Sequence, residues 1–456
     1  MDELLRRVAA VDPDRVAVVT HDDRRTYAQV ADDALRVAAA LTERGIRRFA
    51  IAEVEAAAVL PLLAGASLVG AEACQYPPDS PDDLRSLVER FEHEVLVTDR
   101  DDLQGLAAQV LPTRALLDGA TPGADVQVDA TPPGGVRPHL VLTTGTTGAP
   151  RGVRHDWNRL VRGTARVRPA PDERWLLAFG LHQFAGLQVL LHVAAAGSVL
   201  VAPAPRRPIE GLEAMRALDV THASATPTYW RFLVAQLRSD GGPVPGLRQV
   251  TLGGEAIPGP LLGELRAAFP DASVSQVYAA SEFGSTGSMR DGRAGLSVDV
   301  LDRGDDADVD MRIVEGELWI RSRTGMLGYH GEPAVEADGW RATGDRVEIV
   351  GDRVHFRGRT SEIINVGGVK VHPLPIEDRV AAVDGVVMAR VYGRPNAMTG
   401  AIVALEVVAA PGTDQAELKA ALKAACADLA PAARPRSITF VDDIATKGSK
   451  ILRREP

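Results

Sequence analysis

Segments typical of β-strands alternate with segments typical of helices along the first 260 residues, and this alternation constrains the fold most. A helix is expected from Tyr27 to about Arg44, with apolar residues at helical spacing. Thr26 can cap its N-terminus and Gly45 can end it. The alternation continues with strand 49–54, helix 56–68, and strands 94–98, 140–143, 198–202 and 249–252. It predicts parallel sheets with helices on both faces.

The pattern changes near residue 310. Residues 311–356 read as short strands joined by turns, and a smaller unit follows Arg359. Its predicted elements are strands 386–392 and 401–408, a helix at about 414–429, and a strand at 437–441. We therefore expect an N-terminal domain of residues 1–358 and a C-terminal domain of residues 359–456.

Composition excludes several classes of protein. A chain of 456 residues is too long to fold around a single ordinary hydrophobic core, so two or three packed units are expected. The net charge of −10 argues against a general nucleic-acid partner. The two cysteines, Cys74 and Cys426, lie far apart without Cys-x-x-Cys spacing, which argues against a zinc site or disulfide framework and fits the cytoplasm. We do not expect the N-terminal residues to act as a signal peptide, because they are acidic and lack a long apolar stretch. No apolar run in the sequence reaches the roughly 18 residues of a membrane span. The apolar run at 185–204 predicts a buried helix and strand.

The string TTGTTGAPRGV, residues 143–153, follows a predicted strand and is rich in glycine and threonine. Glycines allow several backbone N–H groups to point into one concavity, the hydroxyls add donors, and Arg151 adds a fixed positive charge. These properties suit a triphosphate. The candidate ATP-binding residues here are Thr143, Thr144, Gly145, Thr146, Thr147, Gly148 and Arg151.

This string resembles the phosphate loop of the adenylate-forming superfamily, which includes acyl-CoA synthetases, aryl-acid ligases, peptide-synthetase adenylation domains and beetle luciferases. Thr144 stands where that loop has serine, and Arg151 where it has lysine. Four further strings occur in the order expected of the family, so the resemblance covers nearly the whole chain. It is closest to an acid–CoA ligase.

Two of these strings imply residues at the nucleotide. In QVYAASE, residues 276–282, the resemblance places Tyr278 beside the adenine, Ser281 at a phosphate and Glu282 at a magnesium ion. Mg²⁺ usually takes one or two carboxylates together with phosphate oxygens. In GWRATGD, residues 339–345, the resemblance assigns Asp345 to the ribose hydroxyls, for which a carboxylate is a suitable acceptor.

The other two strings imply a mobile C-terminal lid. Arg359 would contact the nucleotide and Ser361 would be the hinge, although the family more often has Asp or Lys there. Gly367 and Gly368 would let the thiol arm of the acceptor pass close to the backbone, and a plain hairpin is the alternative. Near the C-terminus, Lys450 would bridge the acid and the ATP phosphates, with Lys447 as the alternative.

The acid-binding side is less defined. His182, Gly253 and Gly254 lie where the family places walls of the acid pocket. The Phe-Asp-x-Ser string of amino-acid-activating relatives is missing, which disfavours an α-amino acid. A small aryl or short acyl acid is expected.

The resemblance implies a large N-terminal region of layered α/β sheets with a small distorted β-barrel, followed by a smaller mobile α+β domain. It implies an AMP-forming acid–thiol ligase that uses ATP, Mg²⁺ and CoA. Three alternatives remain: transfer to the pantetheine of a carrier protein, transfer to a nitrogen nucleophile as in some relatives from secondary metabolism, and a nucleotide-binding sensor without turnover.

Overall fold

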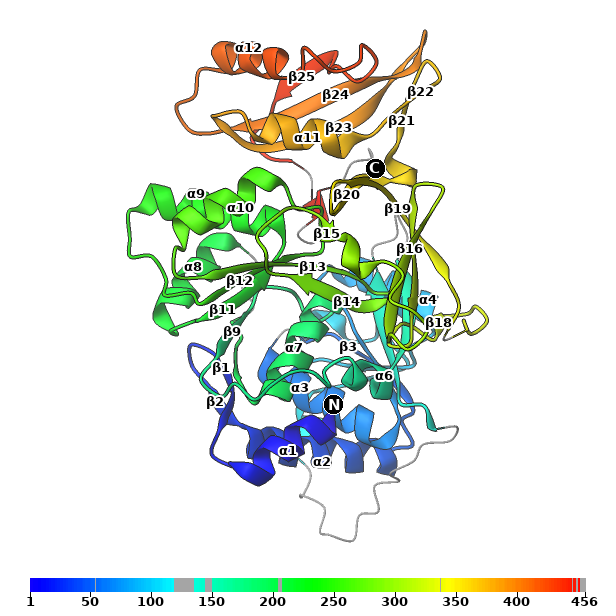
Figure 1. The fold of residues 1–456 in the computed structure, drawn as a ribbon. Helices are drawn as coiled ribbons and strands as arrows, with labels where there is room; N and C mark the ends of the chain where they lie inside the picture. The colour runs from blue at the N-terminus through cyan, green and yellow to red at the C-terminus, as the bar shows by residue number, and fades with distance from the viewer. Residues whose placement is uncertain are drawn as a thin grey trace.

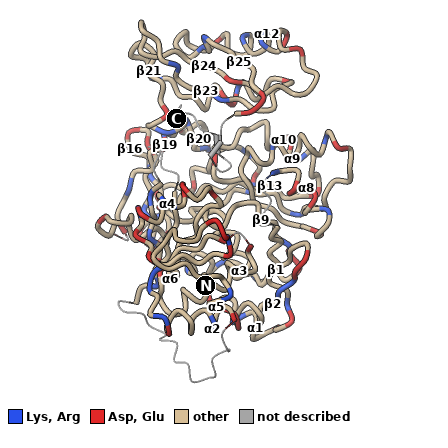
Figure 2. The backbone as a smooth tube through the Cα atoms, turned by 180° about the vertical axis from the view of Figure 1, so that it is seen from behind, with Lys and Arg blue, Asp and Glu red and all other residues tan. Residues whose placement is uncertain are grey.

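The computed structural model shows a large body below a smaller C-terminal unit (Figure 1). It describes residues 1–53, 55–118, 135–143, 150–203, 207–336, 338–444, 446–447 and 450–451, the last two pairs by their backbone alone. Among these described residues, no helix is both long enough and apolar enough to cross a bilayer. Figure 2 shows Lys and Arg interspersed with Asp and Glu over the view from behind.

An eight-stranded sheet forms one layer of the body, in the order β14-β13-β12-β11-β9-β10-β1-β2. Its central strands are parallel, and only the edge strands β14 and β2 are antiparallel to their neighbours. The strands are β1 (Val16–Val19), β2 (Arg24–Thr26), β9 (Arg174–Leu177), β10 (Val199–Val201), β11 (His222–Ala225), β12 (Gln249–Gly253), β13 (Ser273–Ala280) and β14 (Gly284–Met289).

A seven-stranded sheet forms a second layer, in the order β18-β8-β7-β4-β3-β5-β6. Five of its strands are parallel, while β8 and β18 are antiparallel to their neighbours. The strands are β3 (Arg48–Ile51), β4 (Glu72–Gln75), β5 (Val95–Val97), β6 (Gln109–Leu111), β7 (Pro138–Thr143), β8 (Arg151–Asp156) and β18 (Gly328–Tyr329). The expected strand 49–54 therefore begins one residue earlier and ends at Ile51.

Helices cover both faces of these sheets, as predicted. Successive residues of β3 show this, because Phe49 and Ile51 belong to the core between the sheets while Ala50 belongs to a separate core with α4. The inner core contains α1 (Asp2–Val11), α2 (Tyr27–Glu43), α3 (Ala56–Val69) and α7 (Phe184–Ala196). The outer helices are α4 (Pro81–Phe91) on one sheet and α8 (Pro208–Ala217), α9 (Pro227–Asp240) and α10 (Gly259–Ala268) on the other. Two short helices, α5 (Arg114–Leu117) and α6 (Trp157–Arg162), complete the body.

The predicted start of α2 is confirmed in atomic detail. The Thr26 hydroxyl accepts a hydrogen bond from the Gln29 N–H, and the Gln29 side chain accepts one from the Thr26 N–H. This reciprocal capping satisfies two donors that the first helical turn would otherwise leave unpaired. The apolar helices α3 and α7 have no polar stripe, which explains why they lie buried between the sheets.

A five-stranded antiparallel sheet, β15-β20-β19-β17-β16, follows the body. Its two ends approach each other, because Leu301 beyond β15 forms a bridge to Met311 of β16. This curled sheet is the predicted small distorted barrel. Its strands are β15 (Leu296–Ser297), β16 (Val309–Val314), β17 (Glu317–Ser322), β19 (Arg341–Val350) and β20 (Arg353–Arg359).

The C-terminal unit is an α+β layer with its own hydrophobic core. Its elements are β21 (Ile364–Val366), β22 (Val369–Val371), α11 (Pro373–Ala381), β23 (Val386–Asn396), β24 (Gly400–Ala409), α12 (Gln415–Ala425) and β25 (Ser437–Phe440). The helix α11 was not predicted, and α12 ends earlier than expected. A short hairpin of β26 (Thr446–Lys447) and β27 (Lys450–Ile451), red in Figure 1, lies below this unit toward the body.

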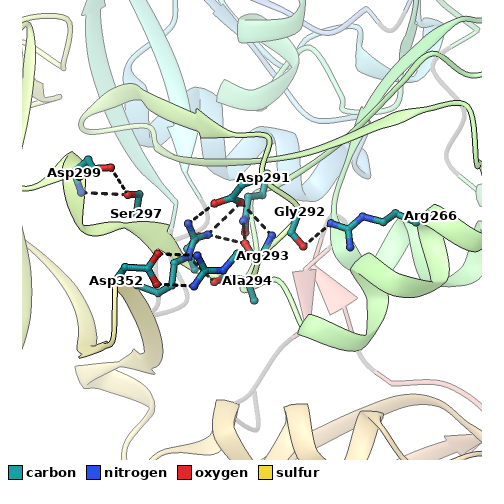
Figure 3. A network of polar contacts seen from close by, with 11 residues as sticks. Arg266, Asp291, Gly292, Arg293, Ala294, Ser297, Asp299 and Asp352 are labelled. Carbon is teal, nitrogen blue, oxygen red and sulfur yellow. Dashed lines mark hydrogen bonds and ion pairs between the residues drawn. The ribbon is translucent and has the colours of Figure 1, made fainter.

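The segment after β14 is tied to the barrel by a polar network (Figure 3). The guanidinium of Arg353, on β20, is 4% exposed and pairs with the Asp291 carboxylate at 2.6 Å. The same guanidinium donates to the carbonyl oxygens of Arg293 and Gly295. Beside it, the exposed Arg293 guanidinium donates to both carboxylate oxygens of Asp352. One buried arginine thus links the eight-stranded sheet to the barrel.

Candidate active site

Several predicted site residues meet at one edge of the eight-stranded sheet. His182 follows β9, Gly253 ends β12, and Tyr278 lies near the end of β13, while β11 lies between β9 and β12. These four strands are adjacent and parallel, so their carboxyl ends share one edge. Ligands of open α/β sheets bind outside this edge. The fold therefore brings the candidate acid-binding and nucleotide-binding residues to the same place.

Tyr278, Asp345 and Arg359 form a contiguous polar group at this edge. The Tyr278 hydroxyl donates to Oδ2 of Asp345 at 2.6 Å, and Nε of Arg359 donates to Oδ1 at 3.2 Å. Asp345 and Arg359 face each other in the register of β19 and β20. The Tyr278 ring packs on Phe356, with 4.8 Å between ring centroids. The group presents an aromatic face beside a carboxylate, which suits a nucleoside.

Burial and the Asp345 carboxylate raise the pKa of Tyr278 well above its usual value. The phenol therefore stays protonated and acts as a hydrogen-bond donor. Asp345 is also held from its backbone, since its N–H donates to the Thr343 hydroxyl at 3.0 Å. That hydroxyl in turn donates to the Leu318 carbonyl on β17. These bonds fix the position of the carboxylate at the strand edge.

A second polar group centres on Glu282, in the turn between β13 and β14. Its Oε1 accepts a hydrogen bond from the Tyr329 hydroxyl at 2.9 Å. The Arg151 guanidinium lies over the Tyr329 ring, 3.3 Å from its centroid, and donates to Glu332 at 2.7 Å. Burial, followed by the nearby Glu282 charge, raises the pKa of Tyr329. This chain of contacts joins the turn that carries Glu282 to strands β18 and β8 of the other sheet.

The predicted phosphate loop begins and ends beside the Glu282 group. Thr143 and Arg151 are partners in the register of β7 and β8, and the Thr143 hydroxyl donates to the Arg151 carbonyl at 3.3 Å. The residues between them that we predicted to bind ATP lie outside the described part of the chain: Thr144, Gly145, Thr146, Thr147 and Gly148. Ser281 lies in the same turn as Glu282.

Glu282 fits a magnesium ion that is held mainly by phosphate oxygens. Within the described residues, no group of three or more His, Cys, Asp or Glu side chains could form an all-protein metal site. Mg²⁺ at nucleotide sites is usually held by one or two carboxylates and the phosphates. A single half-buried carboxylate, joined through Tyr329 to Arg151, matches that donor set.

His182 lies in the loop between β9 and α7. Its ring packs so tightly against Gly180 that a Cβ at Gly180 would be 2.3 Å from the His182 Cε1. Burial lowers the pKa of His182 to about 4, so the imidazole is neutral near pH 7. Gly253 is similarly constrained, because a Cβ there would be 3.3 Å from the Val277 carbonyl oxygen. Gly254 follows with a φ of +83°, which favours glycine.

The residues assigned to the thiol and the hinge lie in the C-terminal unit. Gly367 and Gly368 form the two-residue turn of the β21–β22 hairpin, with φ values of +59° and +88°. The hairpin alone therefore explains their glycines. Ser361 lies in a 3₁₀ turn directly after β20. Lys450 and Lys447 are opposite each other in the β26–β27 hairpin, and their side chains lie outside the description.

Three neighbours of these groups were not predicted: Phe356, Tyr329 and Arg341. Phe356 and Tyr329 lie outside the sequence strings that resemble the family. Their contacts with Tyr278 and Glu282 depend on how the strands pair. Arg341 lies within the GWRATGD string. Residues 341, 343 and 345 share a face if the string is a strand, so its alternation could have indicated Arg341.

Two family models match this chain. The AMP-binding enzyme model matches residues 5–330, and the AMP-binding enzyme C-terminal domain model matches residues 375–450. A Mycobacterium tuberculosis 3-[(3aS,4S,7aS)-7a-methyl-1,5-dioxo-octahydro-1H-inden-4-yl]propanoyl:CoA ligase is 27% identical over 100% of this chain and 97% of its own length. A medium/long-chain-fatty-acid–[acyl-carrier-protein] ligase of the same species is 29% identical over 69% of this chain and 65% of its own length.

Solved structures share the fold at lower identity. An anthranilate CoA ligase in complex with anthranoyl-AMP superposes with a TM-score of 0.81 at 20% identity, covering 99% of this chain and 95% of that one. The Bacillus subtilis o-succinylbenzoate CoA synthetase with ATP and magnesium gives 0.78 at 22% identity, covering 99% and 98%. The match to the first family model spans well over half of the residues, and the chain therefore belongs to the AMP-binding enzyme family.

Proposed function

We propose that this protein uses ATP to convert a carboxylic acid into an acyl-AMP, with release of pyrophosphate, and then transfers the acyl group to the thiol of CoA. One observation carries the proposal: residues far apart in the sequence form two polar groups beside the end of β13, and the second group also includes residues of the other sheet. The Tyr278–Asp345–Arg359 group suits the nucleoside, and the Glu282–Tyr329–Arg151 group suits the phosphates. Similarity to CoA ligases and synthetases supports the same activity.

In the first step, a carboxylate oxygen of the acid attacks the α-phosphorus in line. The new bond joins this oxygen to phosphorus, and the bond from phosphorus to the bridging oxygen of pyrophosphate breaks. Such a displacement needs mainly positioning and electrostatic stabilisation from the protein. Asp345 holds the ribose, Tyr278 lies beside the adenine, and Ser281 and Thr143–Gly148 contact phosphates. Glu282 would be the protein ligand of a bound Mg²⁺, which would supply positive charge to stabilise the pyrophosphate leaving group.

In the second step, the thiol sulfur attacks the acyl carbon, the bond from this carbon to the phosphate oxygen breaks, and AMP leaves with the proton released to water. We propose that residues 359–456 act as a mobile lid that rotates near Ser361 between the steps. Lys450 serves the first step by holding the acid and the phosphates together. The Gly367–Gly368 turn serves the second step. Gating by domain motion is common in enzymes.

The acid is proposed to be a small aryl or short acyl acid. The support is the neutral His182 and the glycines Gly253 and Gly254 at the edge where the acid would lie. A neutral imidazole can form hydrogen bonds to the acid without placing a positive charge in the pocket. The substrates, ATP and CoA, and the two free buried cysteines fit a protein of the cytoplasm.

A carrier protein is the second candidate acceptor, because one relative is a fatty-acid–[acyl-carrier-protein] ligase. The deciding experiment measures pyrophosphate release over a panel of carboxylic acids, with and without CoA, and records AMP and thioester products. We expect acid-dependent pyrophosphate release, and an AMP and thioester yield that rises with CoA.

The other outcomes identify the alternatives. If acyl-AMP accumulates without reacting with CoA but its acyl group is transferred to a pantetheinylated carrier protein, that carrier protein is the acceptor and CoA is not. A stable product formed without any thiol would indicate a nitrogen nucleophile. Absence of acyl-AMP with every acid, together with ATP binding, would favour a sensor and contradict the proposed function.

A further inference from the structure

Arg341, on β19, is a half-buried cation. None of its three guanidinium nitrogens has a hydrogen-bond partner among the residues that the structure describes, although all three are inaccessible to solvent. In the described part of the chain, no carboxylate lies within ion-pair distance of it. The guanidinium carbon lies over the Phe283 ring, 5.4 Å from the ring centroid. A buried charge is costly unless it is paired, so this arrangement favours an anion that is not part of the protein.

The surroundings of Arg341 are those of the phosphate end of the site. A Cβ placed on Gly325 would lie 2.8 Å from the Glu282 carbonyl oxygen and 3.2 Å from Nη2 of Arg341. The guanidinium is therefore next to the backbone of Glu282. It also lies close enough to Glu282 and Tyr329 for their charges to act on it.

The charges around Arg341 do not balance. Arg159 is a second cation whose charge acts on Arg341. The Arg159 guanidinium donates a hydrogen bond to the Met326 carbonyl. Glu282 is the one carboxylate that acts on Arg341 among the described residues. Two guanidinium groups, those of Arg341 and Arg159, therefore face one carboxylate, so this corner is short of negative charge. Desolvation is the main cause of the lowered pKa of Arg341, in agreement with an unpaired cation.

We infer that Arg341 binds the β- and γ-phosphates of ATP, and so the pyrophosphate that leaves in the first step. The inference rests on the proposed function. Arg341 lies at the end of the site that carries Glu282 and Tyr329, whereas Asp345 and Tyr278 mark the nucleoside end. Its planar guanidinium can donate two parallel hydrogen bonds to phosphate oxygens. The acid is a less suitable anion, because its expected position lies beyond β9 and β12.

Arg341→Leu tests the inference by equilibrium binding rather than by turnover. Isothermal titration calorimetry compares Mg-pyrophosphate, Mg-bound α,β-methylene ATP and AMP on the wild type and the variant. We expect the first two ligands to bind roughly ten- to hundredfold more weakly, the range of one or two charge-assisted hydrogen bonds. AMP, which lacks the β- and γ-phosphates, should bind as before.

Thermal unfolding separates binding from a structural role. Because the ligand-free protein carries the cost of an unpaired cation, Arg341→Leu should not lower the melting temperature without ligand. The rise in melting temperature that Mg-pyrophosphate causes in the wild type should be lost. Arg341→Lys, which keeps the charge but not the planar fork, should restore part of the affinity and provides a test if the leucine variant does not fold.

Arg312→Leu is the matched control, because Arg312 is also a half-buried arginine of the barrel but lies over Trp340. Its replacement should leave Mg-pyrophosphate affinity unchanged. Equal loss of AMP and pyrophosphate affinity in Arg341→Leu, or unchanged pyrophosphate affinity, would overturn the inference. A wild-type protein that binds neither AMP nor the ATP analogue would contradict the proposed function itself, an outcome distinct from failure of the Arg341 inference.

Discussion

At the scale of single residues, Tyr278 links the nucleoside end of the site to Asp345. In Tyr278→Phe the ring still packs on Phe356, but the hydrogen bond to Asp345 at 2.6 Å is lost. We expect AMP affinity, measured by calorimetry, to fall about three- to tenfold, the range of an ordinary hydrogen bond, because the lost bond positions Asp345 and does not itself contact AMP. Tyr76→Phe is the control, since it removes a buried hydroxyl that bonds His93 in another core. Equal AMP affinity in both variants would contradict the role of Tyr278.

Lys450 is the second residue whose role can be isolated. Lys450→Ala should lower acid-dependent pyrophosphate release by about a hundredfold or more, since a preorganised charge is removed from the transition state. It should leave thioester formation from synthetic acyl-AMP nearly unchanged, because the lid would have withdrawn Lys450 by then. Lys447→Ala is the matched variant from the same hairpin. If Lys447→Ala shows this split and Lys450→Ala does not, the two assignments exchange places.

At the scale of elements, the contacts of Arg353 hold β20 against the segment that follows β14. Arg353→Leu would leave the Asp291 carboxylate and the carbonyl oxygens of Arg293 and Gly295 without their donor. We expect the free energy of unfolding to fall by about 2–4 kcal/mol, a little less than for a fully buried pair, because Arg353 is buried but Asp291 is partly exposed. Arg293→Ala removes an exposed ion pair from the same network and should cost less than about 1 kcal/mol. Urea unfolding measures both, and equal costs would refute a central role for Arg353.

At the scale of the whole molecule, buried histidines make stability depend on pH. Burial lowers the pKa of His155 to about 3 and that of His139 to about 4, against 6.5 for an exposed histidine. Between these values the unfolded chain binds more protons than the folded one, so stability falls as pH drops from about 6.5 toward 3. The stability that the two neutral histidines contribute is fully present above about pH 6.5. The free energy of unfolding should therefore decrease steadily when measured at pH 7, 6 and 5.

His155 offers a direct test of this dependence, because it is fully buried and stacks on Phe184. In the part of the chain that the structure describes, neither of its ring nitrogens has a hydrogen-bond partner. His155→Leu should reduce the slope by at most about 1.4 kcal/mol per pH unit in this window. A slope that does not change would show that His155 takes up its proton in the folded state.

The parts of the fold and site that the sequence predicts correctly depend on near neighbours in the chain. Thr26, the apolar spacing and Gly45 define α2 within one segment, and the runs of strand and helix define the layers. The strings that resemble the adenylate-forming family include Tyr278 and Asp345, which the fold then brings into contact. In contrast, α11 was missed because it is short and begins within Pro-rich sequence, residues 373–375.

By itself, the sequence determined the layered α/β class, the capped helix α2 and the family, because capping, periodicity and motif strings act over a few residues. Only the tertiary structure decided the antiparallel edge strands, the contacts of Tyr329 with Glu282 and Arg151, and the unpaired position of Arg341. Tyr278 and Asp345 are 67 residues apart in the chain, Glu282 and Tyr329 are 47 apart, and Arg353 and Asp291 are 62 apart. Such contacts depend on where each strand returns to the sheet, which local patterns do not encode.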